Sequence, residues 1–373
     1  MGLHPRALPD FPWDALSPFR ERARAHPDGV VDLSVGTPVD PTPELIRRAL
    51  SDASNSPGYP TTQGTAELRS AVTQWFARTR GVPGLDPDAV LPTVGSKELV
   101  AWLPALLGLS TGDVVVHPAT AYPTYAVGAT LAGASAVATD SVSDWADRED
   151  VRLVWINSPS NPTGAVMSRD ELRAIVDAAR RIGAVVASDE CYAALPWAEP
   201  WASEGVPSVL DPEVCGGDHT GLLALYSLSK QSSLAGYRAA FAAGDPALIA
   251  DLLATRKHIG MMVPAPVQAA MATALRDDSH VGAQREVYRA RRAALLPAVE
   301  AAGFTVSGSD AGLYLWATRD ESCWKTLEWL AERGIVAAPG SFYGVAGERH
   351  VRIALTATDE RVQSGAHRLS KDR

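Results

Sequence analysis

The sequence has few cysteines, no long apolar run and no excess of basic residues, and each absence excludes a class of protein. Its three cysteines, Cys191, Cys215 and Cys323, are odd in number and form no C-x-x-C pair, so neither a disulfide framework nor a zinc site is expected. No stretch approaches the roughly 20 apolar residues that a membrane helix needs. The net charge of −9 disfavours nucleic-acid binding, which needs a basic surface to contact the phosphates. We therefore expect no metal, no nucleic-acid partner and no membrane partner.

The composition is typical of a soluble globular protein. Apolar residues make up 46% and charged residues 21% of the 373 positions. Residues 1–14 contain Pro, Asp and Trp where a signal peptide would need a basic start and an apolar run, which indicates a cytoplasmic protein. A chain of this length exceeds one core of usual size, so a large and a small domain with a cleft between them are expected.

Short apolar runs alternate with helix-like stretches between about residues 90 and 243. A clear helical pattern covers residues 169–183. The runs expected to form strands are 90–93, 114–117, 153–156, 185–188, 222–227 and 239–243. This alternation predicts an α/β fold in which helices sandwich a mostly parallel sheet.

The pattern changes after Pro266 to a long helical stretch at 279–302. Strands are expected near 313–317, 336–339 and 351–354, which together indicate a separate α+β lobe. A lone early strand at 30–35 either completes this lobe or lines the cleft. We therefore predict a large domain at 46–276, with an N-terminal arm and small domain formed by 1–45 and 277–373.

Three of the predicted strands are followed by polar segments. These segments are 158–164 (SPSNPTG), 188–192 (SDECY) and 227–230 (SLSK). Because the carboxyl ends of parallel strands meet at one edge of a sheet, we expect them to lie close together. A lysine after a strand is by itself usually a solvated loop residue. Together, however, the segments offer an amine, a carboxylate, an amide, a phenol and hydroxyls, the groups that pyridoxal phosphate requires.

The three motifs, with Arg238 eight positions after Lys230, resemble the fold-type I, class I and II pyridoxal-phosphate-dependent aminotransferases. The resemblance covers nearly the whole chain. It implies an aspartate-aminotransferase-like fold and ping-pong amino transfer between amino acids and 2-oxo acids. It also implies a cofactor held as a Schiff base on Lys230, and a homodimer.

The resemblance assigns catalytic roles to residues of these motifs. Lys230 would also act as the base that moves a proton from the substrate α-carbon, and Asp189 would keep the pyridine nitrogen protonated. Asn161 and Tyr192 would bind the phenolic oxygen of the cofactor. Cis peptide bonds are expected at Pro159 or Pro162.

The cofactor phosphate requires donors and positive charge. The family pattern assigns this task to Ser227, Ser229, Arg238 and the turn Gly95-Ser96-Lys97, which opens a predicted helix. Tyr122 matches the aromatic residue that stacks on the cofactor. Tyr59 resembles the tyrosine that reaches the phosphate of the neighbouring subunit, which would make the active site a property of the dimer.

The same pattern assigns substrate binding. Arg352 would clamp the α-carboxylate with its planar guanidinium, Gly36 would offer its backbone N–H to that carboxylate, and Asn161 would contribute as well. Closure of the two lobes would then exclude water from the reacting centre. Cys191 is assigned to packing, whereas Trp13 is the tryptophan expected to depart from a core role.

Four segments resemble a subgroup, the actinobacterial-type N-succinyldiaminopimelate aminotransferases of lysine biosynthesis. They are 11–14, 33–41, 256–264 and 310–316. The distal carboxylate of such a substrate needs a further cationic or donor-rich contact, for which Lys257 and the Met261-Met262 stretch are candidates.

Several alternatives share the same fold and cofactor residues. They are an N-acetylornithine, aspartate or aromatic aminotransferase, or a pyridoxal-phosphate-dependent β-lyase. A regulator that senses pyridoxal phosphate is disfavoured, because it needs an attached DNA-binding module and the resemblance starts within the first dozen residues. A non-catalytic binding protein is disfavoured, because the lysine, the aspartate and the arginine equip the site for turnover.

Overall fold

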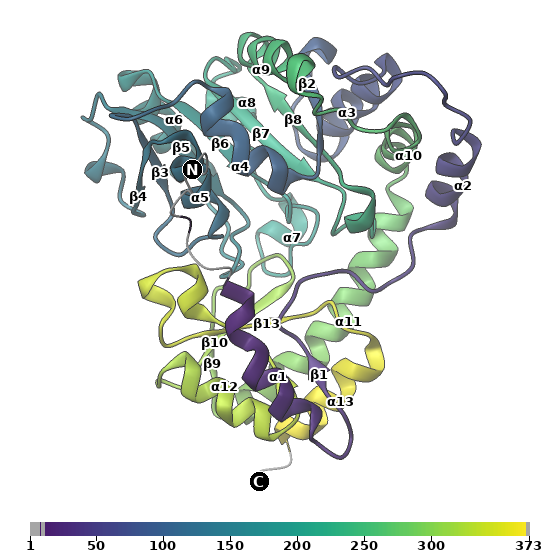
Figure 1. The fold of residues 1–373 in the computed structure, drawn as a ribbon, viewed down its shortest axis with the longest axis vertical. Helices are drawn as coiled ribbons and strands as arrows, with labels where there is room; N and C mark the ends of the chain where they lie inside the picture. The colour runs from purple at the N-terminus through teal and green to yellow at the C-terminus, as the bar shows by residue number, and fades with distance from the viewer. Residues whose placement is uncertain (1–7, 9–11, 371–373) are drawn as a thin grey trace, which may run out of the picture.

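The computed structural model describes Leu8 and residues 12–370, arranged as a larger and a smaller body (Figure 1). The larger body contains a seven-stranded sheet of order β2-β8-β7-β6-β5-β3-β4. The strands are β2 (Val90–Val94), β3 (Val114–His117), β4 (Ser135–Ala138), β5 (Val151–Asn157), β6 (Val185–Asp189), β7 (Leu222–Ser227) and β8 (Ala239–Gly244). β8 runs antiparallel to both of its neighbours, and the other pairs are parallel. The sheet is therefore mixed but mostly parallel, as predicted.

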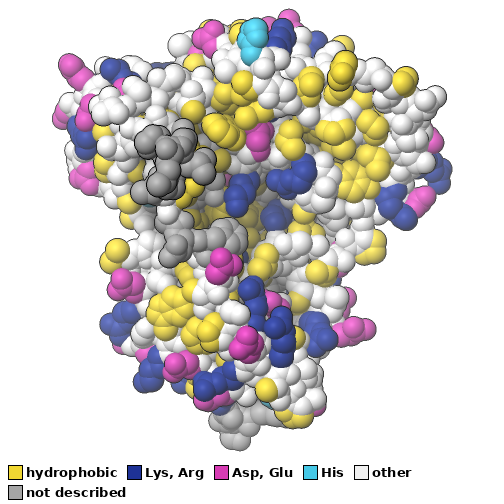
Figure 2. All heavy atoms as spheres, in the orientation of Figure 1, with side chains coloured by type: hydrophobic (Ala, Val, Ile, Leu, Met, Phe, Trp, Pro, Cys, Tyr) yellow, Lys and Arg dark blue, Asp and Glu magenta, His cyan; other side chains and the backbone are white. Residues whose placement is uncertain are grey.

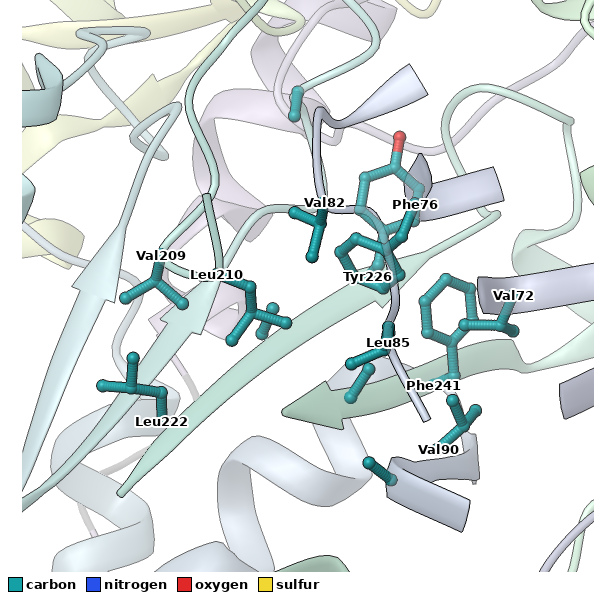
Figure 3. Packing of buried hydrophobic residues seen from close by; sticks show 14 of the residues in the cluster. Val72, Phe76, Val82, Leu85, Val90, Val209, Leu210, Leu222, Tyr226 and Phe241 are labelled. Carbon is teal, nitrogen blue, oxygen red and sulfur yellow. The ribbon is translucent and has the colours of Figure 1, made fainter. Parts of the chain in front are cut away.

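Helices cover both faces of this sheet. The helices of the larger body are α2 (Glu44–Asp52), α3 (Ala66–Thr79), α4 (Ser96–Leu106), α5 (Thr124–Ala132), α6 (Arg169–Ile182), α7 (Trp201–Glu204), α8 (Pro212–Cys215), α9 (Pro246–Ile259) and α10 (Ala265–Arg276). Successive side chains of β7 point to opposite faces: Tyr226 packs with Phe76 and Phe241 in one apolar cluster (Figure 3), whereas Leu223 and Leu225 join another. This double burial explains why the predicted strands are nearly continuous apolar runs.

The ends of α6 show how local sequence fixes an element. Ser168 and Glu171 form a capping box at its start, and Gly183 adopts a left-handed conformation just after its end. The helix lies within the predicted range 169–183.

The smaller body contains a four-stranded antiparallel sheet of order β12-β13-β10-β9. Its strands are β9 (Thr305–Ser307), β10 (Tyr314–Thr318), β12 (Ala338–Pro339) and β13 (Val351–Ala354), and its helices are α1 (Ser17–Arg24), α11 (Ser279–Ala301), α12 (Cys323–Glu332) and α13 (Asp359–Ser370). The early strand β1 (Val31–Asp32) pairs in parallel with β11 (Ile335–Val336). It therefore completes the smaller body, which was one of the two predicted placements.

The long helix α11 runs from the larger body into the smaller one (Figure 1). The short 3₁₀ helices are η1 (Pro12–Leu16), η2 (Pro87–Ala89), η3 (Val142–Asp144), η4 (Ala235–Tyr237), η5 (Gly340–Tyr343) and η6 (Val345–Gly347). None of the helices in the described residues is long and apolar enough to span a bilayer. We propose the division into 46–276, and 1–45 with 277–373, as the domains; α2 begins just before the first boundary and α11 just after the second.

Candidate active site

A cavity of about 300 Å³ lies between the two bodies, where the carboxyl ends of β5, β6 and β7 meet the smaller sheet. Figure 2 shows lysine and arginine side chains gathered in the hollow between the bodies. The lining residues are Trp13, Val35, Gly36, Thr37, Ser96, Lys97, Tyr122, Asn161, Asp189, Cys191, Tyr192, Ser227, Ser229, Lys230, Ala235, Arg238, Tyr314 and Arg352. The fold thus brings the predicted site residues together in one lining, with the exception of Gly95 and Tyr59. Gly95 is not in the lining itself, but it precedes Ser96 and lies against Arg238.

Asp189 ends β6 and is buried. Its Oδ2 accepts a hydrogen bond of 2.9 Å from the Tyr125 hydroxyl, and its Oδ1 accepts one of 3.2 Å from the backbone N–H of Cys191. Burial raises the pKa of Asp189 above its ordinary value, and these hydrogen bonds oppose the rise. The carboxylate is therefore held in a fixed orientation, suited to pairing with a cationic ring nitrogen.

Lys230 follows β7, and its Nζ donates to the backbone oxygen of Gly36 on the smaller body. Burial lowers the pKa of Lys230, and the positive charges of Arg352 and Arg238 lower it further. A lowered pKa increases the fraction of neutral amine, which is the form that acts as nucleophile or base.

A cradle for an anion lies beside Lys230. A Cβ on Gly95, whose φ is +76°, would lie 2.1 Å from Nη2 of Arg238, so only glycine lets the guanidinium approach the start of α4. The hydroxyls of Ser227 and Ser229 are 2.8 Å apart on the adjoining turn. Free N–H groups at a helix start, hydroxyls and a guanidinium are the donors that a phosphate group requires.

Arg352 projects from β13 into the opposite wall. Its Nη1 donates to Oδ1 of Asn161 at 2.9 Å and its Nη2 to the backbone oxygen of Ser34 at 2.7 Å. Its Nε is buried and has no partner in the described part of the chain. The guanidinium carbon lies 3.9 Å from the ring centre of Tyr314. The guanidinium is held flat and keeps a free donor for a carboxylate.

Two phenols meet beside Lys230. The hydroxyl oxygens of Tyr192 and Tyr314 are 3.1 Å apart. Burial and the neighbouring Tyr314 raise the pKa of Tyr192. Burial also acts to raise the pKa of Tyr314, but the charges of Arg352 and Lys230 outweigh it, so this pKa is lowered.

Other predicted residues fall in different places. Tyr59 is 96% exposed, and Lys257 is exposed on α9. Neither Lys257 nor the Met261-Met262 pair belongs to the cavity lining among the described residues. Lys97 lines the cavity with its Nζ 5.9 Å from the ring centre of Tyr122.

Three further expectations concern the loops around the cavity. The Ser158-Pro159 and Asn161-Pro162 bonds are both cis, as predicted. Trp13 lines the cavity and also packs against two apolar clusters, so it combines both roles; Phe11 of the same motif lies outside the described residues. Cys191 packs in an apolar cluster and also lines the cavity.

Sequence reasoning missed Tyr125 and Tyr314 as site residues. Tyr125 belongs to α5 and is not part of any motif, and no pattern in the sequence indicated its bond to Asp189. Tyr314 stood within a segment used for the subgroup resemblance, but nothing in the sequence indicated its contact with Tyr192.

Comparisons with known proteins agree with this geometry. The family model described as "Aminotransferase class I and II" matches residues 28–369. The "Probable aminotransferase Rv1178" of Mycobacterium tuberculosis is 59% identical over 98% of this chain and 86% of its own length. The "4-dedimethylamino-4-oxo-anhydrotetracycline transaminase OxyQ" of Streptomyces rimosus is 55% identical over 98% of this chain and 100% of its own length.

Solved structures share the fold. A probable N-succinyldiaminopimelate aminotransferase from Thermus thermophilus superposes with a TM-score of 0.85 at 27% identity, covering 96% of this chain and 99% of that one. An aspartate aminotransferase variant from Thermus thermophilus gives 0.87 at 23% identity, covering 100% and 99%. The fold is therefore aspartate-aminotransferase-like.

The family uses pyridoxal phosphate, and the residues present fit that cofactor. The cradle at Gly95, which a Cβ would fill, suits the phosphate, and Asp189 suits the ring nitrogen. The motifs, the cavity and the full-length matches lead to one conclusion: this chain belongs to the class I and II aminotransferase family.

Proposed function

We propose that this aminotransferase moves an amino group between N-succinyl-LL-2,6-diaminopimelate and 2-oxoglutarate, a step of diaminopimelate and lysine biosynthesis. The observation that carries this proposal is a second cavity of about 530 Å³ beside the first. Trp13, Lys97 and Tyr122 line both cavities. The site therefore has room for a long acylated side chain beyond the reacting carbon.

Pyridoxal phosphate, when bound through Lys230, supplies an electron sink for negative charge at the substrate α-carbon. Asp189, held by Tyr125, keeps positive charge on the ring nitrogen. Lys230, once released by the substrate amine, moves the proton at the α-carbon. Its lowered pKa suits that task at a pH below its ordinary range.

Arg352 orients the substrate. An incoming α-carboxylate would take the unpartnered Nε and displace the contacts to Asn161 and the backbone of Ser34. Asn161 would then be released toward the phenolic oxygen of the cofactor, which Tyr192 also serves. Because Arg352 belongs to the smaller body and Lys230 and Asp189 to the larger, a substrate held by groups of both bodies would draw the two bodies together.

Lys97 is our candidate for the distal carboxylate, besides its proposed contact with the cofactor phosphate. It lies at the junction of the two cavities, whereas Lys257 lies on the surface of α9. The rest of the second cavity is largely apolar, with Ala101, Val127 and Phe342 among its lining residues. An aliphatic chain ending in a carboxylate matches this arrangement.

The test is a glutamate-dependent amino-transfer assay with purified protein and pyridoxal phosphate. It compares N-succinyl-diaminopimelate with N-acetylornithine, aspartate and aromatic amino acids. A kcat/KM at least about tenfold higher for the succinylated substrate supports the proposal, since tenfold corresponds to roughly one well-placed ionic contact. Preference for another donor disproves the substrate assignment, and release of pyruvate from a cystathionine-like substrate would indicate a β-lyase.

A second candidate substrate is a large polycyclic ketone. Aromatic residues, Trp13, Tyr122, Phe342 and Tyr343, line the second cavity, and flat aromatic walls suit fused rings. The 55% identical relative from Streptomyces rimosus is named as the transaminase of such a substrate, 4-dedimethylamino-4-oxo-anhydrotetracycline. Amination of an anhydrotetracycline ketone in the same assay, with no turnover of succinyl-diaminopimelate, would favour this candidate.

We also propose a cytoplasmic homodimer. Tyr59 is 96% exposed in the single chain, and Ile259, Val35 and Val39 are large apolar residues that are exposed as well. A partner subunit would cover such groups and let Tyr59 reach the neighbouring phosphate. Light scattering on the purified protein tests the mass, and a monomer at micromolar concentration would exclude the dimer. Cell fractionation tests the cytoplasmic location, and recovery of the protein outside the cytoplasmic fraction would contradict it.

A further inference from the structure

A separate cavity of about 430 Å³ begins one residue beyond the catalytic lysine. Lys230 lines the active-site cavity, whereas Gln231 lines this one. The walls come from the end of α3, the loop after β6 with α7, and the first turns of α11. Three rings, those of Trp75, Trp201 and Tyr226, contribute to them.

Two polar side chains of this cavity, those of Gln231 and Arg285, have buried donors without an acceptor among the described residues. The Oε1 of Gln231 accepts a hydrogen bond of 2.5 Å from the Tyr226 hydroxyl. Its Nε2 has no partner among the described residues, and the whole residue is only 2% exposed. Arg285, on α11, makes no ion pair or side-chain hydrogen bond within the described residues, and its Nε is buried. Unpaired buried donors are rare in folded proteins, because they lose water without gaining an acceptor.

Other charged groups around the cavity have partners. Arg80 pairs with Glu190 at 2.8 Å and donates to two backbone oxygens, and Asp278 pairs with Arg78. Glu204 also belongs to the lining, but it is exposed on α7 and makes no ion pair among the described residues. Apart from Arg80, which has other bonds, the lining residues with a buried, unpartnered polar atom are thus Gln231 and Arg285. Both offer donors, next to aromatic and small apolar walls.

We propose that this cavity is a second ligand site, which takes a small carboxylate attached to an aromatic ring. The carboxylate accepts hydrogen bonds from Gln231 and Arg285, and the ring packs against the tryptophan and tyrosine walls. The site is distinct from the substrate cavity and does not depend on which amino acid is transferred. Because Gln231 and Lys230 are adjacent, its occupant contacts the same turn that carries the cofactor.

The experiment uses 3-phenylpropionate as the probe and calorimetry on the cofactor-loaded protein. An Arg352→Met background removes the carboxylate clamp of the substrate cavity, so that remaining binding reports on the second site. We expect one equivalent to bind per chain. Arg285→Ala added to this background should weaken binding at least about tenfold, since a charge-assisted contact is lost. Gln231→Glu, which keeps the acceptor for Tyr226 but replaces the donor, should weaken it as well.

Matched controls separate the donor role from general disruption. Arg289→Ala, one turn further along α11, removes an exposed arginine that pairs with Glu286; it should leave the affinity unchanged. The neutral 3-phenylpropionamide should bind more weakly than the carboxylate. The proposal is overturned if the Arg352→Met protein binds no probe, or if Arg285→Ala and Arg289→Ala bind it equally well.

Discussion

The hydroxyl oxygens of Tyr192 and Tyr314 lie 3.1 Å apart, and this contact joins the two bodies across the active site. Tyr192 follows β6 of the larger body, and Tyr314 begins β10 of the smaller one. The same Tyr314 ring packs against Arg352. One side chain thus connects the proposed carboxylate clamp to the proposed partner of the cofactor's phenolic oxygen.

Tyr314→Phe should lower kcat/KM about tenfold while leaving the fold intact, because it removes one buried hydrogen bond but keeps the ring under Arg352. Steady-state kinetics and thermal melting measure both effects. Tyr343→Phe is the matched control, since its buried hydroxyl has no partner in the described chain. Equal kinetics for the two variants would exclude a role for the Tyr314 hydroxyl.

Lys230→Ala should lower turnover at least about a thousandfold, within the range that a positioned base and nucleophile contributes. The absorbance band of covalently bound cofactor should disappear as well. Circular dichroism checks that the fold survives. Turnover close to that of the natural protein would show that another lysine carries the cofactor.

The pH dependence of cofactor uptake should follow Lys230. Burial and the neighbouring cations lower its pKa below the ordinary 10.5, so uptake of pyridoxal phosphate by the apoprotein should rise with pH through a midpoint below 10.5. Arg352→Met removes one of these cations and should move the midpoint to higher pH. Stopped-flow absorbance measures it, with the exposed Arg349→Met as control. A midpoint that stays in place would contradict the assigned coupling.

The same lowered pKa predicts a sign for stability. Between the folded pKa of Lys230 and 10.5, the unfolded chain binds more protons than the folded one. The stability of the apoprotein should therefore gain from this group as pH rises through that window. Urea unfolding of the apoprotein and of Lys230→Met at several pH values gives the free energy of unfolding of each protein. The slope of that free energy against pH should be larger for the natural apoprotein than for the variant in this window.

Gly95→Ala should weaken cofactor retention about tenfold or more, because its Cβ would collide with Arg238. Gly108→Ala is the matched control: Gly108 has a similar φ of +77° but nothing within 4 Å of an added Cβ. Both should lose about 1–3 kcal/mol of stability from backbone strain. Equilibrium dialysis of pyridoxal phosphate separates them, and equal retention would argue against the cradle.

Arg80→Met should lower the free energy of unfolding by about 3–5 kcal/mol, because it leaves Glu190 buried without its partner. Arg276→Met breaks an ion pair with Glu67 that is half exposed and should cost at most about 1 kcal/mol. Urea denaturation compares the two. Glu190 also accepts hydrogen bonds from the Ser208 hydroxyl and the backbone N–H of Val209. Similar losses for the two variants would show that these two bonds alone satisfy its carboxylate.

Six of the seven strands of the larger sheet could be predicted because each is an apolar run bounded by polar turns, as in β7. β4 was not predicted, since Ser135–Ala138 lies at the sheet edge and is mostly exposed. β9 was not predicted either, because it also lies at a sheet edge and is mostly exposed. The residues of the SPSNPTG, SDECY and SLSK motifs could be placed together because parallel strands end at one edge.

The sequence by itself determined the alternation of strands and helices, the motif residues around Lys230 and, through them, the family. These features depend on local pattern and on residue type. Only the tertiary structure decided that Tyr314 meets Tyr192, that Tyr125 holds Asp189, and that Gln231 faces a cavity of its own. Such contacts join segments far apart in the chain, and their partners are chosen by how the two bodies pack, which no local pattern records.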